Sequence, residues 1–331
     1  ARKLKEIANK THQLVEQQYR ALQDELLPQM KQEGVRFLKM EDLNPAELKE
    51  VEAHFDEQIF PVLTPMAIDA YRPFPMLLNK SINLAVVLRD NDEEAENPFK
   101  TAIVQMPSVL ERLFVLQGKS GKERIVLLED IISYFISKLF HGFSVVSVAV
   151  FRITRNADMT IHEEGARDLL KEIEKELRKR KWGAAVRLEV QKEGLDPEVL
   201  AYLMDELEVL KKDVYEIEGP IDLTLFFGFY KRMAKTHAKL IYESRISQPP
   251  RSLAFHEDIF EKVMDQDIFL HHPYESFEPV VEFVSEAADD PEVLAIKQTL
   301  YRVSGDSPII KALKRAAEKG KQVTVLVELK A

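Results

Sequence analysis

Apolar and polar positions near the start of the chain follow a spacing close to 3.6. Apolar residues recur at Leu4, Ile7, Leu14, Val15, Tyr19, Leu22 and Leu26. This spacing predicts one long amphipathic helix over residues 1–33, which ends or kinks near Pro28 and is closed by Gly34. The apolar face of such a helix needs a partner.

A second helix is predicted a few residues further on. Asn44 can cap its first turn, and Pro45 suits the first helical position, where no backbone N–H is needed. The helix should extend to about Phe60. We expect the two helices to form the end of a helical domain that occupies residues 1–60.

Residues 61–247 change from a helical to a mixed pattern. Prolines crowd residues 61–79, and because proline cannot donate ladder or helix hydrogen bonds, we expect an ordered crossing segment there. Strand patterns follow at 83–89, 101–106, 112–117, 124–128, 145–153 and 186–190, and helical patterns at 130–140, 163–181 and 197–208. The mixture predicts an α+β domain.

The last part of the chain, residues 248–331, predicts the beginning of a third domain. Its first residues, 248–273, are rich in turn signals and lose clear periodicity towards their end. A strand over 293–301, a helix from Ser307-Pro308 to Gly320 and a buried strand over 323–327 then predict a β-α-β unit. Its two strands should be parallel, with a right-handed crossover.

One edge of this β-α-β unit is a candidate ligand site. The carboxyl ends of parallel strands and the amino end of the intervening helix meet at the same edge. Arg302, Ser304 and Gly305 follow the first strand, and Lys330 follows the second. A guanidinium beside free helix N–H groups can bind phosphate oxygens. A solvated surface loop is the alternative interpretation of the same residues.

Charge and composition narrow the class of protein. The chain has a net charge of -10, which argues against nucleic-acid binding, yet residues 295–331 carry six Lys and two Arg against three acidic residues. An anion would therefore meet the C-terminal part. There is no cysteine, and we see neither a signal peptide nor a membrane span, so we expect a soluble protein of the reducing cytoplasm.

Several motifs along the chain resemble those of one enzyme family. They are DPEVLAIKQTLYR at 290–302, SGDSPII at 304–310, GKQVTVLVELKA at 320–331, FPVLTP at 60–65, PFP at 73–75, RITRNAD at 152–158, EGP at 218–220 and HHPY at 271–274. In this order they resemble the polyphosphate kinases of bacteria. The resemblance spans most of the chain.

The resemblance implies a multidomain α+β fold in three parts. Residues 1–60 would be the end of the N-terminal helical domain, and residues 61–247 a middle α+β domain of the dimerisation type. Residues 248–331 would begin the first of two phospholipase-D-like α/β catalytic domains. The chain would then be an internal fragment of the enzyme, lacking the start of the N-terminal domain and most of the catalytic half.

The resemblance also implies a reaction. In the family a histidine takes the terminal phosphate of ATP and passes it to polyphosphate, with Mg²⁺ required. Arg302 falls on a position of the family's magnesium and phosphate site. Because a guanidinium has no lone pair for a cation, we expect Arg302 to hold phosphate oxygens that the metal also touches. The phosphohistidine would lie beyond Ala331, so we expect no turnover by this chain alone.

Partners and location follow from the same resemblance. ATP, ADP and inorganic polyphosphate are the implied substrates and products, and a homo-oligomer, dimer or tetramer, is implied. We expect no nucleic acid and no transmembrane segment. The cytoplasm is the expected location, with attachment at the inner face of the membrane left open.

Other residues suggest rival sites. His237 and Lys239 mimic the His-x-Lys signature of phospholipase-D-like enzymes, but they precede the β-α-β unit, so we expect an exposed basic helix face there rather than a catalytic site. His271 and His272 are adjacent, so their side chains should point to opposite faces rather than share a metal ion. The acidic residues at 90–96 lack the EF-hand spacing and predict a solvated loop.

Two aromatic features and two alternative functions complete the predictions. Trp182 and the aromatic run at 226–230 are expected to pack or to contact another subunit rather than to stack on bases. The alternatives to a polyphosphate kinase are a non-catalytic dimerisation scaffold and a phospholipase-D-like phosphodiesterase that uses His237.

Overall fold

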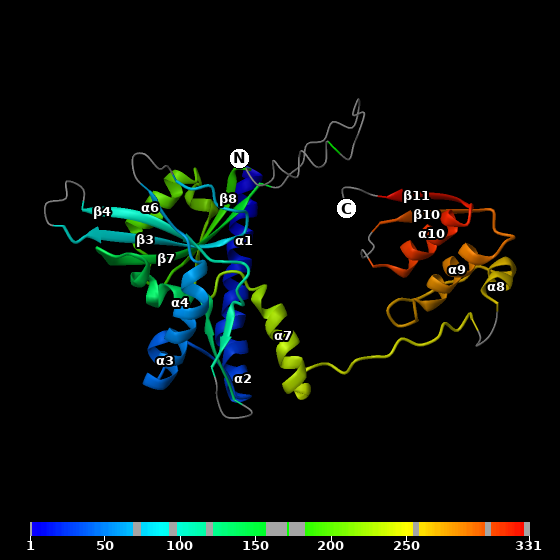
Figure 1. Ribbon diagram of the computed structural model, residues 1–331, viewed down its shortest axis with the longest axis horizontal. Helices are drawn as coiled ribbons and strands as arrows, with labels where there is room; N and C mark the ends of the chain where they lie inside the picture. Colours follow the sequence, from blue (N-terminus) through cyan, green and yellow to red (C-terminus); the bar gives the residue numbers. More distant parts are fainter. Residues whose placement is uncertain are drawn as a thin grey trace. The chain divides into compact units, whose positions relative to one another are not determined.

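The chain folds into two compact units, shown in Figure 1. The structure, a computed structural model, describes residues 2–68, 74–92, 98–116, 122–156, 171, 183–253, 258–301 and 306–327. The first unit is Ala1–Ala238 and the second is Lys239–Ala331. The fold is a multidomain α+β fold, as the sequence predicts. The predicted boundary at residue 60, between a helical and a middle domain, stays a prediction. So does the predicted boundary at residue 247, between the middle and the third domain.

The N-terminal helix forms as expected, with one irregular turn. It comprises α1 (Arg2–Arg20), a π-helical turn (Ala21–Leu26) and α2 (Leu27–Gln32). The π turn lies directly before Pro28, which has no N–H to donate to the preceding turn, and proline is a common cause of such irregularity. The helix ends before Gly34, whose φ of 88° few other residues adopt.

The second helix is α3 (Pro45–His54). The Asn44 side chain accepts hydrogen bonds from the N–H groups of Ala46 and Glu47, and the Glu47 side chain accepts one from the Asn44 N–H, a capping box. A π-helical turn (Phe55–Ile59) and a 3₁₀ turn (Phe60–Val62) extend it to the expected end.

A six-stranded sheet forms the centre of the first unit (Figure 1). Its order is β2-β4-β3-β7-β8-β9, and all neighbours are antiparallel except β8 and β9. The strands are β2 (Pro65–Ile68), β3 (Ile82–Asp90), β4 (Phe99–Gln105), β7 (Phe143–Arg155), β8 (Ala185–Gln191) and β9 (Val214–Ile217).

Two of these strands were not predicted. The sequence indicates an irregular crossing over residues 61–79, yet β2 pairs with β4 there. Pro65 is tolerated because it is the first residue of an edge strand, where a missing N–H costs no ladder bond. β9 has only four residues, too few to show a period of two.

A smaller sheet lies in the same unit. Its order is β1-β6-β5, from β1 (Val35–Leu38), β5 (Leu113–Val115) and β6 (Glu123–Leu127), and β1 was also not predicted. The helices of the region are α4 (Leu128–Phe135), α6 (Pro197–Glu206) and α7 (Leu225–Thr236). The expected helix over 163–181 lies outside the described residues, apart from Lys171, which is helical.

Both faces of the six-stranded sheet are buried. Leu84 and Val86 of β3 pack in one hydrophobic cluster with Val51 of α3 and Ile131 of α4. Ala85, the residue between them, points into a second cluster that contains residues of α6. Figure 1 shows α6 on one side of the strands and α3 and α4 on the other. The alternation of strand side chains thus joins two cores into one unit.

The second unit is built on two parallel strands. They are β10 (Ala295–Leu300) and β11 (Gln322–Val327), joined by α10 (Pro308–Glu318), and α9 (Glu278–Asp289) packs beside α10. A short helix, α8 (Ile259–Asp265), falls where the sequence shows no clear periodicity. Seven residues are too few for a recognisable helical period.

Candidate functional site

The second unit contains the β-α-β arrangement that the sequence predicts. β10 and β11 pair in parallel from Ala295 opposite Gln322 to Leu300 opposite Val327. The carboxyl ends of the two strands therefore lie side by side. Buried apolar side chains, among them Ile309 and Leu313, pack α10 against the strands and α9. This packing fixes the edge at which ligands of α/β units bind.

Arg302, the predicted phosphate-binding residue, lies outside the described residues. So do Ser304, Gly305 and Lys330, and none of the four is placed. Tyr301, the last described residue before them, is 68% exposed directly after β10. The assignment of Arg302 to this edge stays a prediction.

The amino end of α10 lacks the side-chain cap that the sequence predicts. Ser307 occupies the cap position with extended backbone (φ -65°, ψ 132°), but its side chain makes no capping hydrogen bond. Pro308 follows in the first turn and has no N–H. The remaining N–H groups of the first turn lack a side-chain acceptor from the cap residue, so they can donate to an anion.

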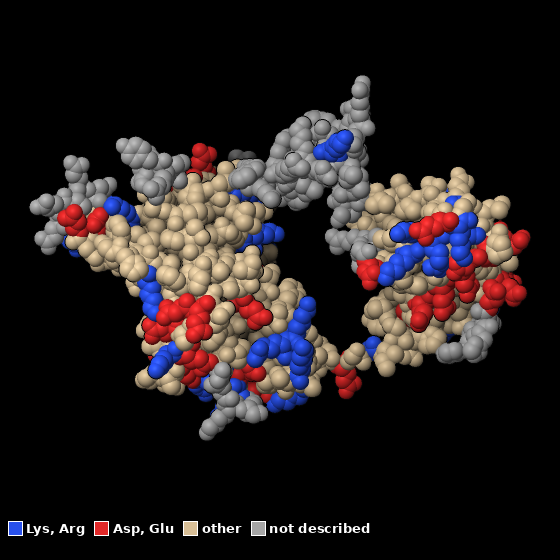
Figure 2. All heavy atoms as spheres, viewed as in Figure 1, with Lys and Arg blue, Asp and Glu red and all other residues tan. Residues whose placement is uncertain are grey.

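Several basic residues of the second unit lie at the carboxyl end of α10, away from the predicted ligand edge, and are paired. Asp289 of α9 accepts hydrogen bonds from Arg315 (2.9 Å) and Lys319 (2.7 Å) of α10, and Lys321 donates to the Val293 carbonyl at 2.8 Å. Figure 2 shows the resulting basic and acidic surfaces side by side over α10 and α9. These contacts join the carboxyl end of α10 to α9. Arg315, Lys319 and Lys321 thus contribute to packing, whereas Lys311 pairs with the exposed Asp306 at the amino end of α10.

Asp289 makes the second unit sensitive to acid. Hydrogen bonds from Arg315 and Lys319 lower the pKa of the Asp289 carboxyl to about 2. A carboxyl whose pKa is depressed on folding stabilises the fold above its unfolded pKa and loses this effect as the pH falls through its folded pKa. We expect Asp289→Asn to lower the melting temperature at pH 6, and the difference from wild type to shrink steadily as the pH falls from about 4 towards 2. Melting curves of both proteins across this range test it; an equal difference at every pH would contradict it.

His237 is not assembled into a nucleophilic site by the described residues. It is the residue after α7, and its Nδ1 lies 2.8 Å from the hydroxyl of the adjacent Thr236. Lys239 lies in a short 3₁₀ turn, exposed. The geometry is that of a basic helix end, which is what we expect from the sequence.

His271 and His272 contact different groups. The His271 ring packs on Tyr274 with 5.1 Å between centroids, and the His272 ring meets Phe277 edge-on at 5.3 Å. Glu275 ties the turn together, since its carboxylate accepts a hydrogen bond from the His271 N–H at 2.7 Å. Within the described part of the chain no group of three or more His, Asp or Glu could hold a metal ion.

The remaining sequence candidates have structural explanations where they are described. Asp90 accepts a hydrogen bond from Lys100 at 2.9 Å, which lowers the pKa of its carboxyl. Phe226 and Phe229 of α7 pack on Phe37, with ring centroids 5.7 and 5.5 Å apart. The aromatic run at 226–230 is therefore partly core. Residues 93–97 and Trp182 lie outside the described residues.

Sequence reasoning missed one further group of cations. Lys80, Arg112 and Arg232 line a common cavity in the first unit. They come from a turn before β3, the start of β5 and the middle of α7. Only tertiary structure brings such distant residues together, and no spacing in the sequence signals it.

The chain is thus a multidomain α+β protein whose second unit is built on a parallel β-α-β arrangement. The profile of the family "Polyphosphate kinase middle domain" matches residues 46–229, more than half of the chain, and "Polyphosphate kinase C-terminal domain 1" matches residues 258–331. The chain belongs to the polyphosphate kinase family. The resemblance noted in the sequence is thereby confirmed.

Similar proteins agree with this assignment. The chain is 61% identical over its whole length to a polyphosphate kinase of Bacillus cereus and 58% identical over 99% of its length to one of Halalkalibacterium halodurans. It covers 47% and 46% of these relatives, so it spans about half their length. The crystal structure of polyphosphate kinase from Porphyromonas gingivalis matches 99% of the chain with a TM-score of 0.81 at 25% identity, and 47% of that protein is covered.

Among the described residues no helix is long and apolar enough to cross a membrane.

Proposed function

We propose that the chain is part of a polyphosphate kinase, which reversibly transfers the terminal phosphate of ATP to polyphosphate. A phosphohistidine beyond this chain carries the phosphate between the two. The observation that carries the proposal is the succession of the two family profiles along residues 46–331, the second of which contains the β-α-β ligand edge. The chain spans about half the length of its relatives, and in our proposal it is inactive alone.

Arg302 is the residue of this chain that we assign to the phosphate. It comes two residues after the end of β10, and the amino end of α10 comes a few residues later. A bidentate guanidinium and free N–H groups together offer positioned positive charge. Phosphoryl transfer depends mainly on such charge around the transferred group, so Arg302 would lower the barrier by holding phosphate oxygens.

Magnesium does not fit as a metal held by this chain's described residues. They contain no cluster of three carboxylates or histidines, and the guanidinium of Arg302 has no lone pair. A hard cation of this kind is commonly bound through substrate phosphates. In our proposal Mg²⁺ arrives with ATP, and Arg302 contacts the same phosphate group from the protein side.

The other partners and the domain roles belong to the same proposal. ATP, ADP and inorganic polyphosphate are the small-molecule partners, and a homo-oligomer, dimer or tetramer, forms through residues 61–247. Residues 1–60 end the N-terminal helical domain, and residues 248–331 begin a phospholipase-D-like domain. The location is cytoplasmic, with the inner face of the membrane as a second possibility to be tested by fractionation.

A comparison of two lengths of protein tests the function. The chain as given should make no polyphosphate from ATP, whereas a protein extended to the length of its relatives should make it. Extended protein that assembles but makes none would favour the dimerisation scaffold and overturn the kinase. His237→Ala in the extended protein should leave the rate near wild type, because the described contacts of His237 are confined to a helix end. A loss of about a hundredfold or more, the least that general acid–base catalysis usually contributes, would favour the phosphodiesterase.

A further inference from the structure

A cavity of about 710 Å³ lies in the first unit, between the turn before β3, the end of β4, the start of β5 and α7. It is far along the sequence from the ligand edge of the second unit. Pockets of this volume commonly hold a small molecule. Its cationic lining residues are Lys80, Arg112 and Arg232.

Backbone strain marks two of its lining residues. Lys80 has φ of 63° and Asp222 has φ of 62°, values that are costly for residues other than glycine. Asp222 has a local reason, since its carboxylate accepts hydrogen bonds from the N–H and hydroxyl of Thr224 at the start of α7. Lys80 has a local reason as well, because it is the third residue of a turn in which the Ser81 N–H donates to the Leu78 carbonyl at 3.2 Å.

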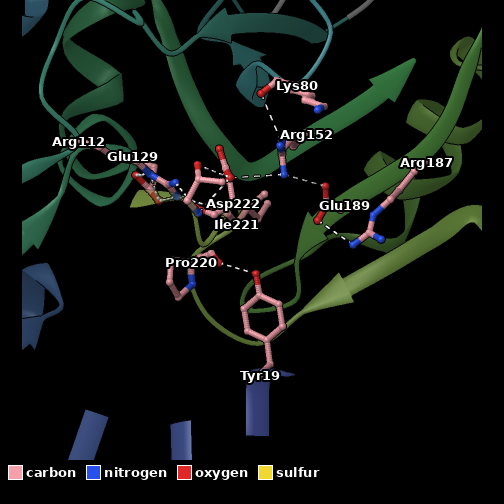
Figure 3. A network of polar contacts seen from close by, with 11 residues as sticks. Tyr19, Lys80, Arg112, Glu129, Arg152, Arg187, Glu189, Pro220, Ile221 and Asp222 are labelled. Atoms are coloured by element: carbon pink, nitrogen blue, oxygen red, sulfur yellow. Dashed lines mark hydrogen bonds and ion pairs between the residues drawn. The ribbon is translucent and has the colours of Figure 1, made fainter. Parts of the chain in front are cut away.

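The backbone of Lys80 is held in place from both sides. Its N–H donates to the Ile153 carbonyl at 2.9 Å, and its carbonyl accepts from Nε of Arg152 at 3.3 Å. Figure 3 shows Arg152 between Lys80 and the carboxylates of Asp222 and Glu189, while no contact reaches the Lys80 ammonium. Among the described residues the Lys80 ammonium makes no ion pair, and Lys80 lines the cavity.

The other two cations divide their roles. The guanidinium of Arg112 is fully engaged by Glu129 and by the carbonyls of Ile221 and Asp222, so it forms a wall. The Arg232 side chain is 49% exposed. Its guanidinium lies 3.4 Å from the Glu123 carboxylate, which is longer than a usual hydrogen bond. Figure 2 shows basic side chains gathered over α7. Lys80 and Arg232 are therefore the two cations of the cavity with capacity for an anion.

Gly228 supplies independent support. It lies in the interior of α7, where glycine is less favourable than alanine. A Cβ built on Gly228 would meet nothing within 4 Å, so packing within the chain does not require glycine. Gly228 lines the same cavity and leaves bare backbone at its wall. Close approach of a bound molecule is a reason for glycine at such a position.

We propose that this cavity is a second anion site, which binds a phosphate chain between Lys80 and Arg232 against the backbone of Gly228. Two sources offer this chemistry, inorganic polyphosphate and the phosphates of a nucleotide. The lining also contains two acidic residues, Glu111 and Asp222. The choice of a phosphate chain rests on the proposed function; the presence of an anion site does not.

Calorimetric titration of the chain with tripolyphosphate and, separately, with ADP tests the proposal. Tighter binding of tripolyphosphate assigns the site to polyphosphate, and tighter binding of ADP assigns it to a nucleotide. Lys80→Gln should weaken binding of the preferred ligand by about tenfold or more, the effect of losing one charge-assisted contact. The matched control Lys49→Gln, an exposed lysine of α3 outside the cavity, should bind as wild type.

Gly228→Met separates a binding role from a structural one. The methionine side chain would occupy open space in the cavity, so ligand binding should weaken. The melting temperature should stay the same or rise, because methionine is a better helix former than glycine. Absence of binding by both ligands would overturn the proposal. Binding that survives Lys80→Gln and Gly228→Met but is lost in Arg302→Ala would also overturn it, because the anion would then be in the second unit. Either failure leaves polyphosphate synthesis by the extended protein, and thus the proposed function, standing.

Discussion

Arg302→Ala in the extended protein should reduce polyphosphate synthesis by at least about a thousandfold, the scale on which arginines act in phosphoryl transfer. The reason is that the guanidinium stabilises charge on the transferred phosphate, which no neighbouring residue of the described edge replaces. Initial rates of ATP-dependent polyphosphate formation measure the effect. Arg302→Lys, which keeps the charge but loses bidentate contact, should recover only part of the rate.

Assembly and folding are the necessary controls for this variant. Arg302→Ala should have the oligomeric mass and the melting temperature of wild type, since β10 ends at Leu300, two residues earlier. The exposed Arg245 lies before α8, outside any site that we assign, and Arg245→Ala should keep the wild-type rate. Wild-type synthesis by Arg302→Ala would remove this residue from the phosphate site.

Arg112→Met should lower the free energy of unfolding of the first unit by about 3–5 kcal/mol, the usual effect of breaking a buried ion pair. Arg112 donates to the Glu129 carboxylate at 3.0 Å and to the Asp222 carbonyl at 2.7 Å, and the Glu129 side chain is 1% exposed. The substitution leaves this carboxylate buried without its partner. It also releases the segment that leads into α7 (Figure 3).

Chemical denaturation of a small set of variants measures this effect. The double variant Arg112→Met/Glu129→Leu should be more stable than Arg112→Met, because it removes the unpaired charge. Lys192→Met is the matched control, since Lys192 and Glu218 form an exposed pair on the same unit, and it should be indistinguishable from wild type. A loss in Arg112→Met no larger than that of the control would show that the buried pair is not what holds this segment.

The sequence predicted those elements whose pattern is long or whose ends carry distinct residues. The helix over 1–33, β3 and the parallel β-α-β unit formed as expected, because their periods extend over many residues and Asn44, Ser307-Pro308 and Gly320 mark helix ends. The strands β1, β2 and β9 were missed because four residues show no period, and Pro65 in β2 suggested an irregular segment.

The same difference separates the features of the site that the sequence could predict from those that it could not. The ligand edge could be predicted, because a parallel β-α-β unit brings its strand ends together whatever the rest of the fold. The uncapped state of Ser307 and the pairing of Arg315 and Lys319 with Asp289 could not, because they depend on side-chain positions. Lys80 was missed for the same reason.

Transfer of the labelled terminal phosphate of ATP tests the central claim most directly. In the extended protein the label should appear on the protein in an acid-labile, base-stable form, as expected for phosphohistidine, and then pass to polyphosphate; added ADP should remove it from the protein. The chain as given should take no label. Polyphosphate that forms without a labelled protein, or the absence of any labelled polyphosphate, would contradict the account.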